Sequence, residues 1–364
     1  MHFGKRSTIY QKLNLYPAGI RLNCYINRGT MKTLISAAAV FAISLCMNSS
    51  RTHAAEAQSA SVQAAIAEFN ALHHAKAKQL FSDLLKDDQN KNVANYYLGR
   101  IALGSGDYTA ASKYLETSVR TSPNSADELY WLATSCVLLF QRPSESTNIG
   151  LVLCYQQNLE MALSIDSTHL PTLAALYQFN ATWPVMAGAS SERAAELLKQ
   201  IAAISKPDAD VARLIELNHK EEAGKALALS QSMVAAYPDH EKALLEAGKT
   251  FANNKRYAEA QGAFGKITAN NITIDNRIHI QTAYLEIGQI AWLTKSNIDQ
   301  GIAALTKVVD TNTFAVNFNT NWAYFRLAQL SQLKGDATQQ KKYLQLLDST
   351  GIEKGAALVK AMEN

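Results

Sequence analysis

The side chains that could do chemistry are few and widely spaced. Two adjacent histidines, His73 and His74, lie in a segment with helical apolar spacing, and two adjacent glutamates, Glu221 and Glu222, precede another such segment. Neighbouring residues on a helix point about 100° apart, so adjacent histidines are poorly placed to share one metal ion. We expect the histidines on a solvated helix face and the glutamates at a helix N-terminus, where negative charge is favourable. No metal and no cofactor is expected.

Several common motifs of enzymes are absent from the sequence. It contains no GxSxG nucleophile elbow, no HExxH zinc motif and no P-loop. Gly104 and Gly106 fall in a predicted turn between two helices rather than after a strand. We therefore expect no catalytic residues. A hydrolase with a site built from distant segments would show no motif, and it stays open as an alternative.

Two cysteines, Cys136 and Cys154, could carry redox chemistry or form a disulfide. Small-residue packing places Ala133 opposite Tyr155 in an antiparallel helix pair, so Cys136 should face residues 151–152, with Cys154 near but not squarely opposite. A disulfide needs Cα atoms within about 7 Å. We expect two buried free thiols, with a disulfide as the alternative.

Residues 31–57 have the pattern of a secretory signal peptide. Lys32 precedes an apolar run of about 13 residues that ends at Cys46, shorter than the roughly 20 residues of a membrane span. The small residues of a cleavage site follow at Ala54, Ala55 and Ala57. We expect an exported, periplasmic chain with no stable membrane span after cleavage, and an artefactual or extended N-terminus at residues 1–30. An uncleaved anchor helix is the alternative.

The net charge of +4 arises in this leader. Residues 1–54 hold seven basic and no acidic side chains, so the remainder has 28 basic against 31 acidic groups and a net charge of −3. A basic surface for nucleic acid is therefore not expected in the exported chain.

The rest of the chain repeats one pattern with a period of 34 residues. In the window that begins at Asn92, small residues stand at positions 8, 20 and 27, and Pro123 stands at position 32. Small residues let two antiparallel helices approach closely, and the proline stops the second helix. The small residues predicted to pack between helices are Gly99, Ala111, Ala133, Ala226, Gly248, Ala260, Gly288 and Gly301.

This period and spacing resemble the tetratricopeptide repeat (TPR). The resemblance implies an all-α fold, a right-handed TPR-like solenoid of about seven helix hairpins over residues 58–350. Residues 351–364 would form a C-terminal cap or tail.

Two windows depart from the period. The one around Cys136 needs about ten extra residues, which predicts two longer helices joined around residues 142–144. The next requires a connector from Pro184 to a helix that begins near Ser190 or Ser191. Over residues 92–205 these features resemble a group of exported bacterial TPR proteins with an elongated second hairpin and a Pro-x-Met-x-Gly connector. Four residues differ from that connector, namely Trp183, Val185, Ala187 and Ala189, and the resemblance implies no reaction.

The first helix of each hairpin lines the concave wall of a TPR solenoid. Aromatic, arginine and glutamine side chains on this wall can stack on, and hydrogen-bond to, an extended peptide. The alternative for each aromatic residue is that it packs between helices. The candidate partner-binding residues are Tyr96, Arg100, Tyr130, Thr134, Gln178, Lys249, Gln289, Trp292, Phe325 and Gln329.

The function that we expect is a non-catalytic periplasmic scaffold that binds a protein or peptide partner on its concave face, for example in envelope assembly. A first alternative is binding of a cell-wall polymer or polysaccharide, because Tyr96, Tyr130 and Trp292 could stack on sugar rings. The hydrolase with an unrecognised site is the second alternative.

Overall fold

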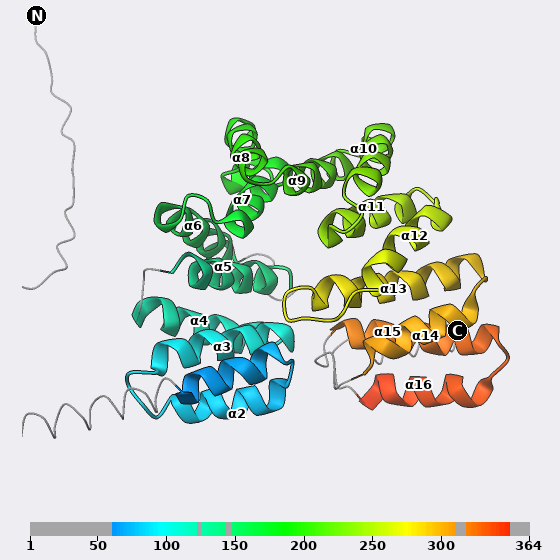
Figure 1. Cartoon of the computed structure of the whole chain (residues 1–364), viewed down its shortest axis with the longest axis horizontal. Helices are drawn as coiled ribbons and strands as arrows, with labels where there is room; N and C mark the ends of the chain where they lie inside the picture. The colour runs from blue at the N-terminus through cyan, green and yellow to red at the C-terminus, as the bar shows by residue number, and fades with distance from the viewer. Residues whose placement is uncertain (1–59, 122–124, 143–147, 311–317, 350–364) are drawn as a thin grey trace, which may run out of the picture. The chain divides into compact units, whose positions relative to one another are not determined.

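The computed structural model describes residues 60–121, 125–142, 148–310 and 318–349 (Figure 1). All of them belong to the second of two units, Glu56–Asn364. Three predicted segments lie outside the described residues: the N-terminal segment 1–30, the signal peptide 31–57 and the tail 351–364.

Every regular element in these ranges is a helix. Residues 60–70 form the first one. The helices of the N-terminal half are α2 His74–Leu84, α3 Lys91–Gly104, α4 Tyr108–Thr121, α5 Ala126–Phe140, α6 Ile149–Ile165, α7 Leu170–Thr182, the short 3-10 helix η1 Val185–Ala187 and α8 Ser191–Ile204. Those of the C-terminal half are α9 Lys206–His219, α10 Ala223–Ala236, α11 Glu241–Asn253, α12 Tyr257–Thr268, α13 Arg277–Thr294, α14 Ile298–Val308, α15 Phe318–Leu333 and α16 Ala337–Ser349.

From α3 to α16, each odd-numbered helix packs on the even-numbered helix that follows it. These seven pairs are helix hairpins. Residues 60–70 pack on α2 before them, and we call this pair the first hairpin. First helices also contact first helices, as in α3 with α5, α9 with α11 and α13 with α15, while the described second helices make no comparable contact with one another. We call the side formed by α3, α5, α7, α9, α11, α13 and α15 the first-helix face. The all-α solenoid predicted from the sequence is the observed fold.

Glycines in three of the first helices bring the two helices of a hairpin together. A Cβ atom at Gly99 would lie 2.5 Å from Leu115 Cγ, and one at Gly248 would lie 2.5 Å from Phe264 Cε1. The same relation joins Gly288 to Leu305. Each large side chain packs directly on the glycine of the facing helix, because glycine has no side chain to prevent this contact.

The remaining small residues of the predicted pattern are also at tight positions. A Cβ atom at Gly301 would lie 2.5 Å from Ala291 Cβ. The predicted alanines are fully buried, namely Ala111, Ala133, Ala226 and Ala260.

Gly-Asp pairs form two of the hairpin turns. Gly106 has a φ of +78° and Gly335 a φ of +74°, a left-handed conformation that glycine adopts without steric cost. The following aspartates then begin the second helices: Asp107 Oδ1 accepts from the backbone N–H of Ala110, and Asp336 Oδ1 accepts from that of Gln339, each at 3.0 Å.

The two irregular hairpins follow the sequence prediction. Helices α5 and α6 have 15 and 17 residues, against 14 in each of α3 and α4. Helix α7 ends at Thr182, before Pro184, and Gly188 turns the chain with a φ of +94°. Ser190 caps α8, since its Oγ accepts from the backbone N–H of Arg193 at 3.2 Å.

A disulfide joins Cys136 in α5 to Cys154 in α6, with the Cα atoms 6.1 Å apart. The expectation of two free thiols is therefore wrong. Cys154 does not need to stand squarely opposite Cys136, because two residues offset along neighbouring helices still fall within the 7 Å that a disulfide spans.

Candidate partner-binding face

Three of the predicted partner-binding residues meet around Arg100. Its guanidinium carbon lies 4.6 Å from the ring centroid of Trp131 and 5.1 Å from that of Phe69. Nη1 of Arg100 donates to the hydroxyl oxygen of Tyr96 at 3.2 Å. Tyr130 packs edge-on against Trp131, with ring centroids 5.2 Å apart. We call Phe69, Tyr96, Arg100, Tyr130 and Trp131 the Arg100 cluster.

Tyr96 connects α3 to α5. Its side chain is buried, and its hydroxyl donates a hydrogen bond to Oδ2 of Asp127. Burial raises the pKa of Tyr96 well above its ordinary value, and the carboxylate of Asp127 adds to this, against the lowering effect of Arg100. The phenol therefore stays protonated and acts as a donor. Tyr96 packs between hairpins more than it faces solvent.

Four further predicted residues meet around Arg326, which is not one of the predicted partner-binding residues. Its guanidinium carbon lies 4.0 Å from the ring centroid of Trp292 and 5.8 Å from that of Phe325. Its Nη1 donates to Oε1 of Gln329 and its Nη2 to Oε1 of Gln289. We call Gln289, Trp292, Phe325, Arg326 and Gln329 the Arg326 cluster. It joins α13 to α15, as the Arg100 cluster joins α3 to α5.

Arg326 is buried, with 7% of its surface exposed. Burial lowers its pKa from the ordinary arginine value to about 10. The guanidinium remains charged at neutral pH, and the carboxamide oxygens of two glutamines and the face of an indole ring compensate for its lost hydration.

The other three predicted residues do not contact either guanidinium. Thr134 donates its hydroxyl to the carbonyl oxygen of Tyr130 in its own helix, at 2.8 Å. Lys249 forms an ion pair of 2.8 Å with Glu246. Gln178 on α7 is exposed.

The two adjacent histidines differ in their surroundings. His73 is exposed and lies 2.7 Å from Oε2 of Glu68. His74 is half-buried, and its Nε2 accepts a hydrogen bond from Nη1 of Arg277 at 2.8 Å. The expectation of a solvated face is therefore wrong for His74. Burial is the main cause that lowers its pKa to about 4, so the ring is neutral at pH 7.

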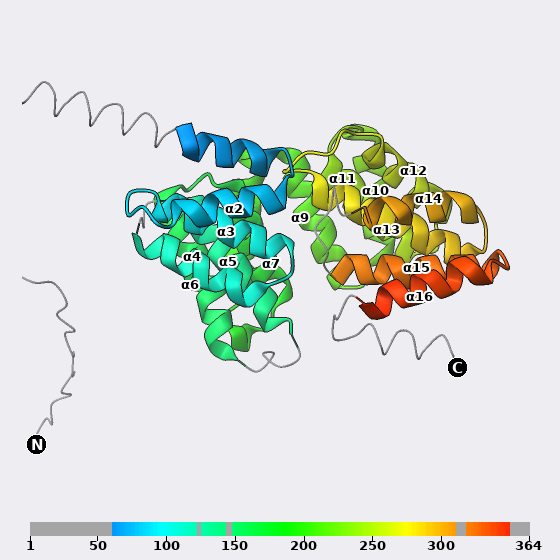
Figure 2. The same ribbon diagram turned by 90° about the horizontal axis from the view of Figure 1, so that it is seen from below.

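The contact between His74 and Arg277 joins the first hairpin to the connection between α12 and α13. Ile274 of that connection packs against the apolar cluster that includes Phe69 and Phe81. Figure 2 shows the yellow segment before α13 beside the blue first hairpin. This contact could not be predicted from the sequence, because the partners are 203 residues apart and share no motif.

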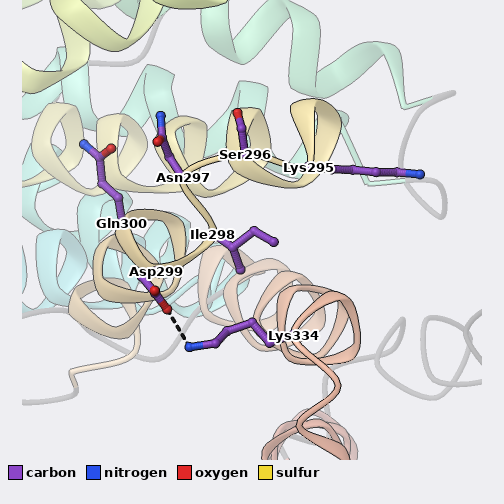
Figure 3. Close-up of a pocket in the computed structure, with 7 residues that line it drawn as sticks. All are labelled: Lys295, Ser296, Asn297, Ile298, Asp299, Gln300 and Lys334. Atoms are coloured by element: carbon purple, nitrogen blue, oxygen red, sulfur yellow. Dashed lines mark hydrogen bonds and ion pairs between the residues drawn. The ribbon is translucent and has the colours of Figure 1, made fainter.

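A surface depression of about 500 Å³ lies at the turn between α13 and α14 (Figure 3). Residues 295–300 and Lys334 line it, and in Figure 3 the amine of Lys334 points to Asp299, with which it forms an ion pair of 2.6 Å. Its polar side chains, which come from the α13–α14 turn, the start of α14 and Lys334, are exposed and not held in place by burial. We assign no function to this depression.

The described ranges contain no group of three or more histidine, cysteine, aspartate or glutamate side chains that could hold a metal ion. Within the same ranges, none of the helices has both the length and the apolar character required to cross a membrane.

Comparison with known proteins supports the repeat. Residues 94–125 match the family model described as a tetratricopeptide repeat. A comparison with curated protein sequences gives no match. Together with the packing of the hairpins, the family match shows that the chain carries a tetratricopeptide repeat within an all-α solenoid.

Several solved structures are similar to this chain in fold. A tetratricopeptide repeat protein from Parabacteroides merdae is 11% identical, with 76% of this chain and 99% of that chain covered and a TM-score of 0.47. PilF of Pseudomonas aeruginosa is 14% identical, covering 70% and 97%, with a TM-score of 0.35. The human IFIT1 dimer with PPP-AAAA is 15% identical, covering 79% and 69%, with a TM-score of 0.43.

Proposed function

We propose that this chain is an exported, non-catalytic TPR scaffold that binds a protein or peptide partner along its first-helix face. The observation that carries the proposal is the convergence of predicted partner-binding residues. Seven of the ten gather in the Arg100 and Arg326 clusters, both formed where two successive first helices meet.

The two clusters suit a peptide better than a sugar polymer. Stacking on a sugar ring requires an open aromatic face, but the guanidinium of Arg326 lies against Trp292, and Tyr96 is buried. Between the clusters, α7 and α11 present polar side chains such as Gln178 and Lys249. A peptide backbone offers carbonyl and N–H groups that arginine, lysine and glutamine side chains can pair with along an extended length.

Two observations support export. The first is the signal-peptide pattern of residues 31–57. The second is the disulfide between Cys136 and Cys154, a bond that persists in oxidising compartments such as the periplasm and is rare in the cytosol.

The experiment that tests the proposal is affinity capture from a native envelope extract, with captured material identified by mass spectrometry. The bait is compared with a face variant that carries Arg100→Ala, Gln178→Ala and Lys249→Ala. A matched control carries three substitutions on exposed second-helix positions, Lys113→Ala, Glu196→Ala and Lys225→Ala. Circular dichroism first establishes that all three proteins are equally helical.

A protein captured by the wild type and the control, but lost from the face variant, supports the proposal. Equal capture by all three baits contradicts it. Retention of all three on purified peptidoglycan, with no captured protein, would favour the polymer-binding alternative instead.

A further inference from the structure

Arginine side chains from two distant segments approach each other where the α12–α13 connection meets the first hairpins. Arg277, the first residue of α13, reaches His74 in α2. A Cβ atom at Gly104 would lie 3.0 Å from Nη2 of Arg277, so the bare glycine leaves room for the guanidinium. Arg100, on the same helix as Gly104, is close enough to lower the pKa of Arg277 through charge repulsion, in addition to the larger effect of burial.

Several buried N–H groups around these arginines have no acceptor. An arginine can only donate, so Nε2 of His74 must be the acceptor in its bond with Arg277, and the ring proton of the neutral histidine sits on Nδ1. That Nδ1 is buried without a partner, as are Nε of Arg277 and Nε1 of Trp131. Buried donors are normally paired, because an unpaired donor loses its hydration without compensation.

The carboxylates in the neighbourhood do not neutralise the two arginines. Neither Arg100 nor Arg277 forms an ion pair with a carboxylate of the described residues. Asp127 is the acid close to the Arg100 cluster, and it accepts from Tyr96 and lies 3.9 Å from Nε2 of His169. This part of the molecule therefore holds two cations and several donors, with few acceptors of its own.

In the Arg326 cluster, the chain itself supplies hydrogen-bond acceptors for the guanidinium. There, too, a guanidinium lies against an indole ring, but Gln289 and Gln329 fill its two terminal nitrogens. Around Arg100, the one acceptor that the described residues offer the guanidinium is the hydroxyl of Tyr96. Among the described residues, Arg100 and Arg277 therefore each pair with one side-chain acceptor, against two for Arg326.

We propose that Arg100 and Arg277 form a binding site for an oxyanion, a carboxylate or phosphate group, at the contact between the α12–α13 connection and the first hairpins. Guanidinium groups bind both kinds of anion through paired N–H donors. The bound anion neutralises two like charges on segments that are distant in sequence. It therefore stabilises the contact between them.

Thermal unfolding of the purified protein tests the site. The probes are inorganic phosphate and succinate, each compared with sodium chloride at equal ionic strength and pH 7.5. Since an anion that binds only the folded state raises the melting temperature, we expect a rise of about 4 °C at roughly 100 times its Kd. A rise with phosphate alone assigns a phosphate site, and a rise with succinate alone assigns a carboxylate site. No rise with either anion overturns the proposal.

Three variants separate specific binding from the general stabilisation that phosphate gives to proteins. Arg277→Met and Arg100→Met should each abolish the anion-dependent rise, and isothermal titration calorimetry should show at least a tenfold weaker affinity. The matched control is Arg326→Met, because the nitrogens of Arg326 are already paired within the chain. This variant should keep the anion-dependent rise and the affinity of the wild type. An equal rise in all three variants overturns the proposal. Should Arg277→Met fail to fold, Arg100→Met decides the question, because Arg100 is only half-buried.

Discussion

Nη1 of Arg277 donates a hydrogen bond of 2.8 Å to Nε2 of His74, and so joins two residues that are 203 positions apart. In a repeat protein each hairpin ordinarily contacts only its neighbours, and stability is approximately a sum of local terms. The contact between α2 and the start of α13 adds a long-range term. It should make the hairpins between them unfold more cooperatively than a simple stack.

The His74 contact should make stability depend on pH. The folded-state pKa of His74 is about 4, below its ordinary value of 6.5, so the unfolded chain binds more protons between these limits. The stabilisation from neutral His74 is complete above pH 6.5 and is lost as the pH falls to about 4. The side chain is only half-buried, so solvent screens part of this effect. We expect the protonation of His74 to lower the unfolding free energy by about 1 kcal/mol at pH 4.5.

Urea unfolding at pH 7.5 and pH 4.5 measures this effect. The wild type should lose about 1 kcal/mol more than His74→Leu between the two pH values, because the variant lacks the titrating ring. An equal loss in both proteins would mean that the folded state does not hold His74 in its neutral form.

A methyl group at Gly248 should disturb the α11–α12 hairpin. The added Cβ atom would lie 2.5 Å from the ring of Phe264, which must then move out of a fully buried position. We expect Gly248→Ala to cost about 1–3 kcal/mol of unfolding free energy.

Gly265 in α12 is the matched control, because a Cβ atom there meets nothing within 4 Å. Gly265→Ala should be neutral or stabilise by roughly 0.5–1 kcal/mol, since alanine loses less backbone entropy in a helix. The packing account fails if both substitutions have the same effect in urea unfolding.

The disulfide between Cys136 and Cys154 can be detected chemically. Alkylation of the unfolded protein without a reducing agent, followed by peptide mapping, should leave both cysteines unlabelled. Replacing them with serines should lower the unfolding free energy by about 2–4 kcal/mol, through the chain entropy that the cross-link removes. If both cysteines are alkylated in protein prepared from an oxidising compartment, the disulfide is absent and this prediction is wrong.

Local features of the fold could be predicted from the sequence, whereas long-range contacts could not. The 34-residue period indicates the helices, and pairs such as Gly99 and Leu115 follow from the need for close approach. The turn at Gly106 and the cap at Ser190 follow from residue chemistry. The disulfide was misjudged because the offset between two facing helices was known only to about one turn.

The candidate site was only partly predictable for a related reason. Positions along the repeat indicated Gln289, Trp292 and Gln329, but the residue that organises them, Arg326, stands one position away from Phe325. The meeting of Arg277 with His74 depends on how far each hairpin rotates relative to the last. Small rotations accumulate over many repeats, and the spacing of apolar residues does not specify them.

Site-specific photo-crosslinking in a native envelope extract tests the partner-binding face most directly. A photoreactive amino acid replaces exposed first-helix residues, Gln178, Lys242 and Trp322, and in separate proteins exposed second-helix residues, Lys113, Glu196 and Lys225. The account predicts that one partner protein crosslinks to the first-helix positions and to none of the second-helix positions. Crosslinks confined to the second helices, or equal on both sides, would contradict it.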